Sequence, residues 1–324
     1  MENNLEQLDD IANDVANKLE TAEGREQLAA ETNSTSKAGF IDFMSKIKNI
    51  YTPDYLDELA KKSYEEDREY PENFSNWYYH IKDFGNFAHA DIISHQIFTF
   101  EESESMRKTD NILNVDWKEI AKILEPTLNK LDNYTLYNIK NGCFSNKFDF
   151  DTCLTSKEDL PKKLWLLNYQ SGIFDTGGYT ELIVREYIPE DMQHNLSIYN
   201  GMPLRTEVRV FYNMDTKQIE YVVDYWDYDY CSKGMHTLND KLIFDIFHNK
   251  MPLDITNHQL ELARIQNEIY SNIDTLKFDG ELSGIWSIDF MYDKKLDQLF
   301  LIDMARGFRS AYWNPERVGG KDNE

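Results

Sequence analysis

The spacing of hydrophobic residues changes along the chain, from helical periods near the start to strand-like alternation in the second half. Over residues 1–22, apolar residues recur at helical spacing and predict an amphipathic helix: Leu5, Leu8, Ile11, Val15 and Leu19. Small and polar residues follow to residue 37 and predict a linker. A single helix of this kind docks on its own protein or recruits a partner, and the pattern leaves both open.

Residues 38–131 mix helical and strand-like patterns, which predicts a small N-terminal α/β domain. Helices are predicted over residues 55–64 and 117–131. Three histidines in this region share neither one helix face nor a tight ligand turn, and we interpret them as core or surface residues: His80, His89 and His95. The pattern in this region predicts secondary structure but no catalytic or ligand-binding motif.

From residue 132 onward strand-like alternation dominates. Ser156 and Asp159 have the spacing of a helix cap ahead of an apolar stripe made by Leu160, Leu164 and Leu167. The pattern predicts these further elements: a strand over 134–140, a strand over 182–188 that Pro189 ends, a hairpin over 204–226, and a helix over 257–276 with Leu260, Leu262, Ile265 and Ile269 as its apolar residues.

The last predicted hairpin holds two aspartates among apolar residues. Its strands cover about residues 284–292 and 299–305. If Tyr292 pairs with Phe300, then Asp289 lies opposite Asp303, and opposed like charges on one face destabilise a sheet. A Mg²⁺ ion would neutralise both, because Mg²⁺ prefers oxygen ligands such as carboxylates. The alternatives are that one aspartate bonds a backbone amide or a distant arginine, or that the register differs.

Two groups of basic residues are candidates for binding phosphate. Arg205 and Arg209 lie on one face of a predicted strand with Glu207 between them. Guanidinium groups grip phosphate oxygens in pairs, although these three residues could equally satisfy one another. Lys140 ends a predicted strand and Lys147 follows a loop, so either could reach the phosphates of a nucleotide.

Composition narrows the class of protein. The chain has 324 residues, of which 41% are hydrophobic, enough for two or more packed units. With 58 acidic and 34 basic residues its formal charge is −24, which disfavours nucleic acid as a partner. No long apolar run and no signal peptide is evident, so we expect a cytoplasmic protein without a membrane span. Three cysteines without Cys-x-x-Cys spacing argue against a zinc site.

Taken in order, four short motifs resemble those of the ATP-grasp superfamily. They are a lysine strand and loop at 137–148, a hinge at 183–189, an arginine strand at 204–211 and a two-aspartate hairpin at 287–305. The cell division cycle protein 123 family, with its phage and bacterial relatives, has a similar Glu-x-Arg-x-Phe strand and Asp-hairpin-Asp ending. The resemblance covers about residues 134–313.

This resemblance implies an α+β, two-lobed fold of antiparallel sheets with helices, preceded by the N-terminal helix and α/β domain. The predicted domains are 1–37 (helix and linker), 38–131 (α/β), 132–190 (small lobe) and 191–318 (large lobe with the metal hairpin). ATP and Mg²⁺ are the expected cofactors. The implied roles are as follows: Lys140 and Lys147 contact phosphates, the backbone at Glu186, Tyr187 and Ile188 meets adenine, Arg205 and Arg209 are catalytic with Arg209 also on the phosphates, and Asp289 and Asp303 bind Mg²⁺.

One position departs from the pattern of the family. Two residues after the second aspartate the family usually has Asn, whereas this chain has Ala305, and Arg306 and Arg309 follow it. Metal binding is then weakened, limited to one ion, or completed by water. The departure affects catalysis more than nucleotide binding.

Three functions are compatible with these residues. The leading hypothesis is an ATP- and Mg²⁺-dependent ligase, which activates a carboxylate as an acyl phosphate for an acceptor on a peptide, protein or small molecule. The second is a non-catalytic, nucleotide-bound chaperone or protein-binding protein, and the third is a structural or phage inhibitory protein with a decayed site. The aromatic cluster at 225–230 stacks on a base or clamps a substrate, or, in the interpretation that we favour, forms a half-buried strand and its turn.

Overall fold

The computed structural model describes residues 53–107, 115–173, 178–188, 196–235, 237–248 and 258–318. The chain divides into two compact units, Met1–Glu65 and Glu66–Glu324. The predicted N-terminal helix and its linker lie outside the described residues. The elements that bear on function belong to the second unit.

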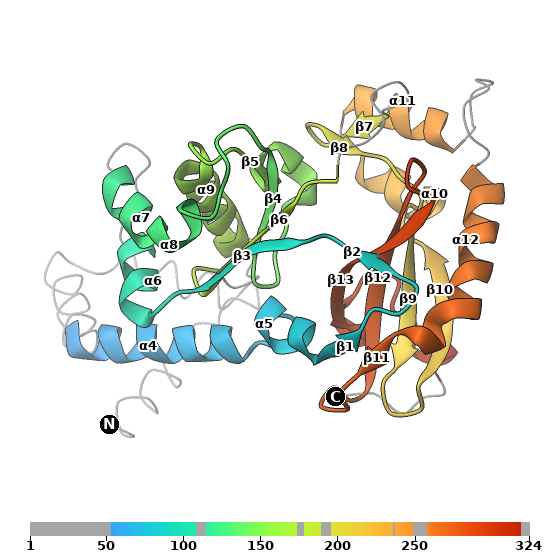
Figure 1. Cartoon of the computed structure of the whole chain (residues 1–324), viewed down its shortest axis with the longest axis horizontal. Helices are drawn as coiled ribbons and strands as arrows, with labels where there is room; N and C mark the ends of the chain where they lie inside the picture. The colour runs from blue at the N-terminus through green and yellow to red at the C-terminus, as the bar shows by residue number, and fades with distance from the viewer. Residues whose placement is uncertain are drawn as a thin grey trace, which may run out of the picture. The chain divides into compact units, whose positions relative to one another are not determined.

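The helices and short 3₁₀ turns of the described residues are drawn in Figure 1. The α-helices are α4 (Pro53–Glu69), α5 (Phe74–Trp77), α6 (Phe100–Arg107), α7 (Trp117–Ile123), α8 (Glu125–Leu128), α9 (Leu160–Ile173), α10 (Tyr228–Cys231), α11 (Leu238–Phe247) and α12 (His258–Asn272). The 3₁₀ turns are η1 (Tyr78–His80), η3 (Lys147–Cys153), η4 (Ser232–Gly234), η5 (Ile273–Thr275), η6 (Gly307–Arg309) and η7 (Pro315–Arg317).

Four strands form one antiparallel sheet in the order β3-β6-β4-β5 (Figure 1). They are β3 (Ile92–Ile97), β6 (Glu181–Glu186), β4 (Tyr137–Asn141) and β5 (Leu154–Thr155). Helix α9 packs into the core of this sheet through the predicted stripe of Leu160, Leu164 and Leu167, which are fully buried. The Ser156 hydroxyl accepts from the Asp159 N–H and donates to its carboxylate, so the predicted cap is confirmed.

A second sheet has five strands in the order β10-β9-β12-β13-β2. They are β10 (Gln218–Asp224), β9 (Glu207–Asn213), β12 (Ile285–Asp293), β13 (Gln298–Arg306) and β2 (Ala88–His89), of which only the β13–β2 pair is parallel. The predicted hairpin over 204–226 is therefore confirmed as β9 and β10. Two further pairs are β1 (Ile81–Asp83) with β11 (Lys277–Phe278) and β7 (Ser197–Ile198) with β8 (Met202–Pro203).

Helix α12 supplies apolar residues to the core of the five-stranded sheet. Leu262, Ile265 and Ile269 are buried there, at the three- and four-residue spacing of one helix face. Leu260, which the sequence placed in the same apolar set, is 68% exposed. That assignment was wrong because a residue two positions before Leu262 lies on another side of the helix.

The predicted single helix over 117–131 is two helices, α7 and α8. Pro126 stands in the first turn of α8, where its missing N–H costs nothing. The same ring in the middle of a longer helix would remove a backbone hydrogen bond and clash with the preceding turn. The predicted strand over 134–140 begins later, at Tyr137.

The two-aspartate hairpin is formed by β12 and β13, and Asp289 pairs with Asp303 as expected. The predicted partner of Tyr292 was wrong, since Tyr292 pairs with Leu299. The register shifts beside Asp289, where Ile302 is the extra residue on β13. This bulge restores the pairing of the two aspartates, which an unbroken ladder in that register would have lost.

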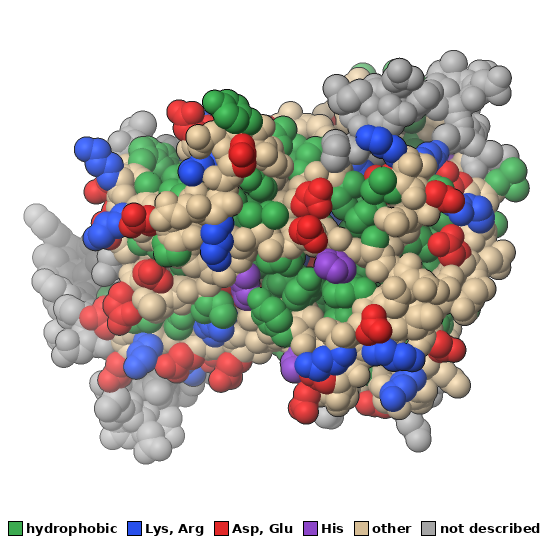
Figure 2. All heavy atoms as spheres, viewed as in Figure 1, with side chains coloured by type: hydrophobic (Ala, Val, Ile, Leu, Met, Phe, Trp, Pro, Cys, Tyr) green, Lys and Arg blue, Asp and Glu red, His purple; other side chains and the backbone are tan. Residues whose placement is uncertain are grey.

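The α+β class is confirmed by these sheets and helices. No helix in the described ranges is long and apolar enough to cross a membrane. On the face shown in Figure 2, Lys and Arg side chains lie among Asp and Glu side chains, with hydrophobic side chains between them.

Candidate functional site

Three strands of the five-stranded sheet bring an arginine and two aspartates into one row. On β12, Asp289 has Asp303 of β13 as its neighbour on one side and Arg209 of β9 on the other. Arg209 donates from Nε to Asp289 Oδ1 at 2.7 Å and from Nη2 to Oδ2 at 2.8 Å. Asp289 is therefore neutralised by a bidentate arginine, one of the alternatives left open by the sequence.

The second aspartate has a different cation, which comes from the four-stranded sheet. Lys140 of β4 donates from Nζ to Asp303 Oδ1 at 2.7 Å. Burial alone would raise the pKa of Asp303, but the Lys140 ammonium, assisted by the Arg185 guanidinium, holds it below its ordinary value. The two opposed acids thus each have a basic partner.

Lys147 lies beside Tyr225, the residue that follows β10. Lys147 Nζ donates to the Tyr225 hydroxyl at 2.5 Å and lies 4.1 Å from the centre of its ring. The Arg209 guanidinium carbon lies 4.9 Å from the same ring. Burial alone would lower the pKa of Lys147, but Tyr225 and the nearby carboxylates of Glu207 and Asp289 raise it above its ordinary value. Lys147 is thus held as a partly buried cation.

Glu207 is the acidic counterpart of Lys147 in this cluster. It lies on β9 and is buried. Burial raises the pKa of Glu207 to about 7; the Lys147 ammonium opposes this rise and the Asp289 carboxylate adds to it. Buried groups with strongly shifted pKa values are concentrated at functional sites.

A cavity of about 120 Å³ adjoins this cluster, several times the volume that one water needs. Its lining comes from both sheets and the segments beside them: Ala90, Asn138, Ser145, Lys147, Phe150, Cys153, Arg185, Glu186, Tyr187, Ile188, Met202, Pro203, Arg205, Glu207, Met291 and Ile302. The wall is largely apolar with a few charged groups, as is usual for small-molecule sites.

The predicted adenine edge lies in the cavity wall. Strand β6 ends at Glu186, whose N–H donates to the Asp91 carbonyl at 2.8 Å, and Tyr187 and Ile188 continue beyond the strand. The Ile188 carbonyl accepts from Arg205 Nη2 at 2.5 Å. Arg205 therefore supports the wall of the cavity, and its predicted catalytic role stays a prediction.

The predicted site residues fall into two adjoining groups. Lys147, Arg205 and the segment from Glu186 to Ile188 line the cavity, whereas Lys140, Arg209, Asp289 and Asp303 form the ion-pair cluster. Lys147 and Glu207 connect the groups, because both line the cavity and both interact electrostatically with Asp289.

Sequence reasoning missed two residues of this site. Arg185 donates to the Ile302 carbonyl at 2.7 Å and to Asn138 Oδ1 at 2.9 Å, and it lines the cavity. Its signal in the sequence was a basic residue directly after the three apolar residues of β6, Leu182, Ile183 and Val184. Tyr225 was interpreted as part of a half-buried strand and turn, and it is a half-buried residue in the turn after β10, but the sequence did not show that its ring meets two cations.

The residues present fit a Mg²⁺ ion in part. Asp303 offers carboxylate oxygen, the ligand type that Mg²⁺ prefers, on a side chain that is 25% exposed. Both oxygens of Asp289 accept from Arg209, so Asp289 becomes a metal ligand only if Arg209 turns to another anion. Ala305 adds no side-chain ligand, while Arg306 donates to the Ser283 carbonyl and Arg309 lies 3.7 Å from Glu72.

Comparison with known proteins gives similarity at the level of structure. No family model and no curated protein matches the sequence. The chain is similar to the solved structure of Cdc123 from Schizosaccharomyces pombe, with 14% identity and a TM-score of 0.41, over 75% of this chain and 86% of that chain. It is also similar to the C-terminally truncated Cdc123 from the same organism, with 14% identity and a TM-score of 0.42, over 78% of this chain and 92% of that chain.

Proposed function

We propose that this protein binds ATP in the cavity, with the adenine against residues 186–188 and the phosphates toward Lys147, Lys140 and Arg209. The observation that carries the proposal is the contiguity of a largely apolar cavity with three buried or partly buried basic residues. The planar adenine ring suits the apolar wall of the cavity. The basic side chains beyond that wall match the negative charge of a triphosphate.

ATP binding by this site involves an exchange of ionic partners. Arg209 and Lys140 now neutralise Asp289 and Asp303. If phosphates became the partners of Arg209 and Lys140, then Asp289 and Asp303 would be available to hold Mg²⁺, which would supply charge neutralisation at the phosphate oxygens. The apo ion pairs therefore keep the cluster electrically balanced without ATP.

Two activities are compatible with a bound nucleotide. In a non-catalytic nucleotide-bound protein, ATP is a structural ligand; the bidentate Arg209–Asp289 pair and Ala305 favour this function, because both reduce the ligands available to a metal. In a ligase, a substrate carboxylate attacks the γ-phosphorus, ADP leaves, and an acceptor then displaces phosphate from the acyl carbon. The opposed Asp289 and Asp303 are the feature that favours this second function.

Thermal unfolding with ATP, ATP plus Mg²⁺, and Mg²⁺ alone tests the proposal. ATP at a hundred times its dissociation constant should stabilise the native state by about 2.7 kcal/mol. Lys147→Met should abolish most of this gain, whereas Lys122→Met, at a side chain that is 75% exposed on α7, should retain it. No rise in the unfolding midpoint with millimolar ATP would contradict ATP binding.

Measuring the release of ADP from ATP distinguishes the ligase from the non-catalytic protein. A ligase should release ADP in an acceptor-dependent manner, and Asp303→Ala should abolish that release. A nucleotide-bound protein without catalysis should bind ATP in the thermal experiment and release no ADP above the rate of the Asp303→Ala variant.

A further inference from the structure

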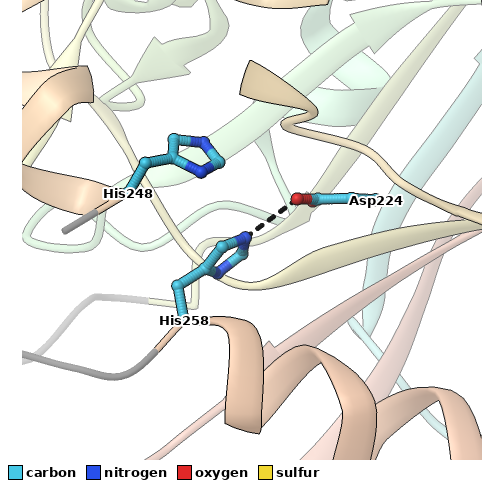
Figure 3. A group of neighbouring side chains, drawn as sticks. All are labelled: Asp224, His248 and His258. Carbon is cyan, nitrogen blue, oxygen red and sulfur yellow. Dashed lines mark hydrogen bonds and ion pairs between the residues drawn. The ribbon is translucent and has the colours of Figure 1, made fainter. Parts of the chain in front are cut away.

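Three side chains of types that can bind a metal ion converge outside the cavity proposed for ATP. Asp224 ends β10, His248 follows α11 and His258 begins α12, and the three point toward one another in Figure 3. One nitrogen or oxygen from each lies within 4.8 Å of the others. His258 and His248 are only 1% and 7% exposed.

The hydrogen bond to Thr206 indicates which ring nitrogen of His258 carries a proton. The Thr206 hydroxyl donates to a carboxylate oxygen of Glu261, so its oxygen accepts from His258 Nδ1–H, at 3.3 Å. A neutral imidazole has one N–H, and Nε2 then carries a lone pair. That nitrogen lies 3.0 Å from Asp224 Oδ2, where a lone pair and a carboxylate repel unless a proton or a metal ion lies between them.

The other two side chains are also held in place. Asp224 Oδ1 accepts from the Trp226 N–H at 3.0 Å, which directs Oδ2 toward His258. The His248 ring is packed among aromatic rings, with centroid distances of 4.5 to 5.4 Å, from Phe244, Phe247 and Tyr228. These aromatic rings hold the His248 ring in place and limit the access of water to it.

We propose that Asp224, His248 and His258 bind a zinc ion that joins β10, α11 and α12, with water as the fourth ligand. Two imidazole nitrogens and one carboxylate are a known zinc donor set, with bonds of about 2.0–2.2 Å. Ligand atoms of a tetrahedral site with such bonds lie about 3.3 Å apart, close to the 3.0 Å between His258 and Asp224. The Thr206–Glu261 pair orients the ligand His258, as outer carboxylates do in zinc sites.

Sequence spacing gave no sign of this site. The two histidines are ten positions apart in the sequence, and Asp224 comes from a strand. The argument against zinc rested on cysteines, none of which belongs to this cluster. The ligands are also separate from the residues proposed for ATP, so the two proposals stand or fall independently.

Zinc titration of the chelator-treated full chain, without nucleotide, tests the proposal. We expect one zinc ion per chain, a higher unfolding midpoint with zinc, and no comparable effect of Mg²⁺. His248→Gln and Asp224→Asn should each weaken zinc binding at least tenfold, while His89→Gln, at an exposed histidine, should leave it unchanged. Thr206→Val should weaken it about tenfold by releasing the His258 ring.

X-ray absorption on the zinc-loaded natural chain keeps the test independent of any variant that fails to fold. A shell of nitrogen and oxygen atoms alone supports the proposal. A sulfur atom in the shell, stoichiometric zinc in the folded His248→Gln variant, or no zinc binding would overturn it, and the last would leave an imidazolium–carboxylate ion pair in its place.

Discussion

At the scale of single residues, the partners in the ion-pair cluster matter for stability mainly because each compensates the charge of the other. A buried pair gains little over an apolar pair, but loss of one partner leaves a buried charge uncompensated. Arg209 and Asp289 are both buried and joined by two hydrogen bonds. Their energetic importance is therefore seen when one is removed.

Asp289→Asn should lower the free energy of unfolding by about 3–5 kcal/mol, because it leaves the Arg209 guanidinium buried without its counter-ion. Equilibrium urea unfolding measures this change. Asp151→Asn is the matched control, since Asp151 is 64% exposed in its pair with Lys163 and an exposed pair contributes about 1 kcal/mol or less. Equal losses in the two variants would contradict the assigned pair.

Glu207 should make the stability depend on pH. Its pKa is raised from an ordinary 4.5 to about 7, so the native protein keeps a proton that the unfolded chain releases. The free energy of unfolding should therefore fall as the pH rises from 4.5 to 7, by roughly 3 kcal/mol in total. Glu207→Gln, which resembles the protonated acid, should remove this loss. Urea unfolding of both proteins across this window measures it, and a pH-independent difference between them would contradict the shifted pKa.

The sequence predicted the acids of the site better than their partners. Alternation placed Asp289 and Asp303 on facing strands, but in a register that the structure does not have at Tyr292, and the bulge at Ile302 restores their pairing. The bond from Lys140 to Asp303 joins residues 163 positions apart, and no local pattern encodes such a contact. Tyr225 was missed for the same reason, because an aromatic residue at a strand end has no sequence mark for the cations that approach its ring.

At the scale of elements, regular spacing predicted helices and strands well and their interruptions poorly. The hairpin of β12 and β13 was predicted to within one residue at either end, yet its bulge at Ile302 was not. A bulge has no residue type of its own in this strand, since Ile also fits an unbroken ladder. The order β10-β9-β12-β13-β2 depends on contacts between distant segments and could not be predicted.

Helix α12 offers a test of which spacing marks its buried face. Ile265→Ala should lower the free energy of unfolding by about 2–5 kcal/mol, because Ile265 is fully buried in the core of the five-stranded sheet. Leu260→Ala, on the same helix at a side chain that is 68% exposed, should change it by no more than about 0.5 kcal/mol. Urea unfolding compares the two, and a large loss in Leu260→Ala would show that its side chain is covered.

At the scale of the molecule, polar side chains join the two sheets at the candidate site. Lys140 of β4 bonds Asp303 of β13, and Arg185 of β6 bonds the Ile302 carbonyl on the same strand. Lys147 and Tyr225 form a third link from segments that follow β4 and β10. Each link uses a cation of the kind that a phosphate attracts, so nucleotide binding and the association of the sheets depend on the same side chains.

Hydrogen exchange should therefore report ATP binding in both sheets at once. Phosphates that replace the acids as partners of Lys140 and Arg209 would bridge β4 and β9, and a ligand bound to the native state slows the local openings that permit exchange. We expect slower exchange with ATP and Mg²⁺ in β4, β6 and β9 and no change in α7, which lies outside the site.

The strands that gain protection show whether the nucleotide contacts both sheets or only one of them. Protection limited to β4 and β6 would place the nucleotide on the four-stranded sheet alone and would contradict the role of Arg209. In Lys140→Met, one basic partner of the phosphates is absent and Asp303 has lost its ammonium. If the exchange of partners is correct, that variant should bind ATP more weakly and its protection in β9 should weaken together with that in β4, because a bridging ligand couples the two strands.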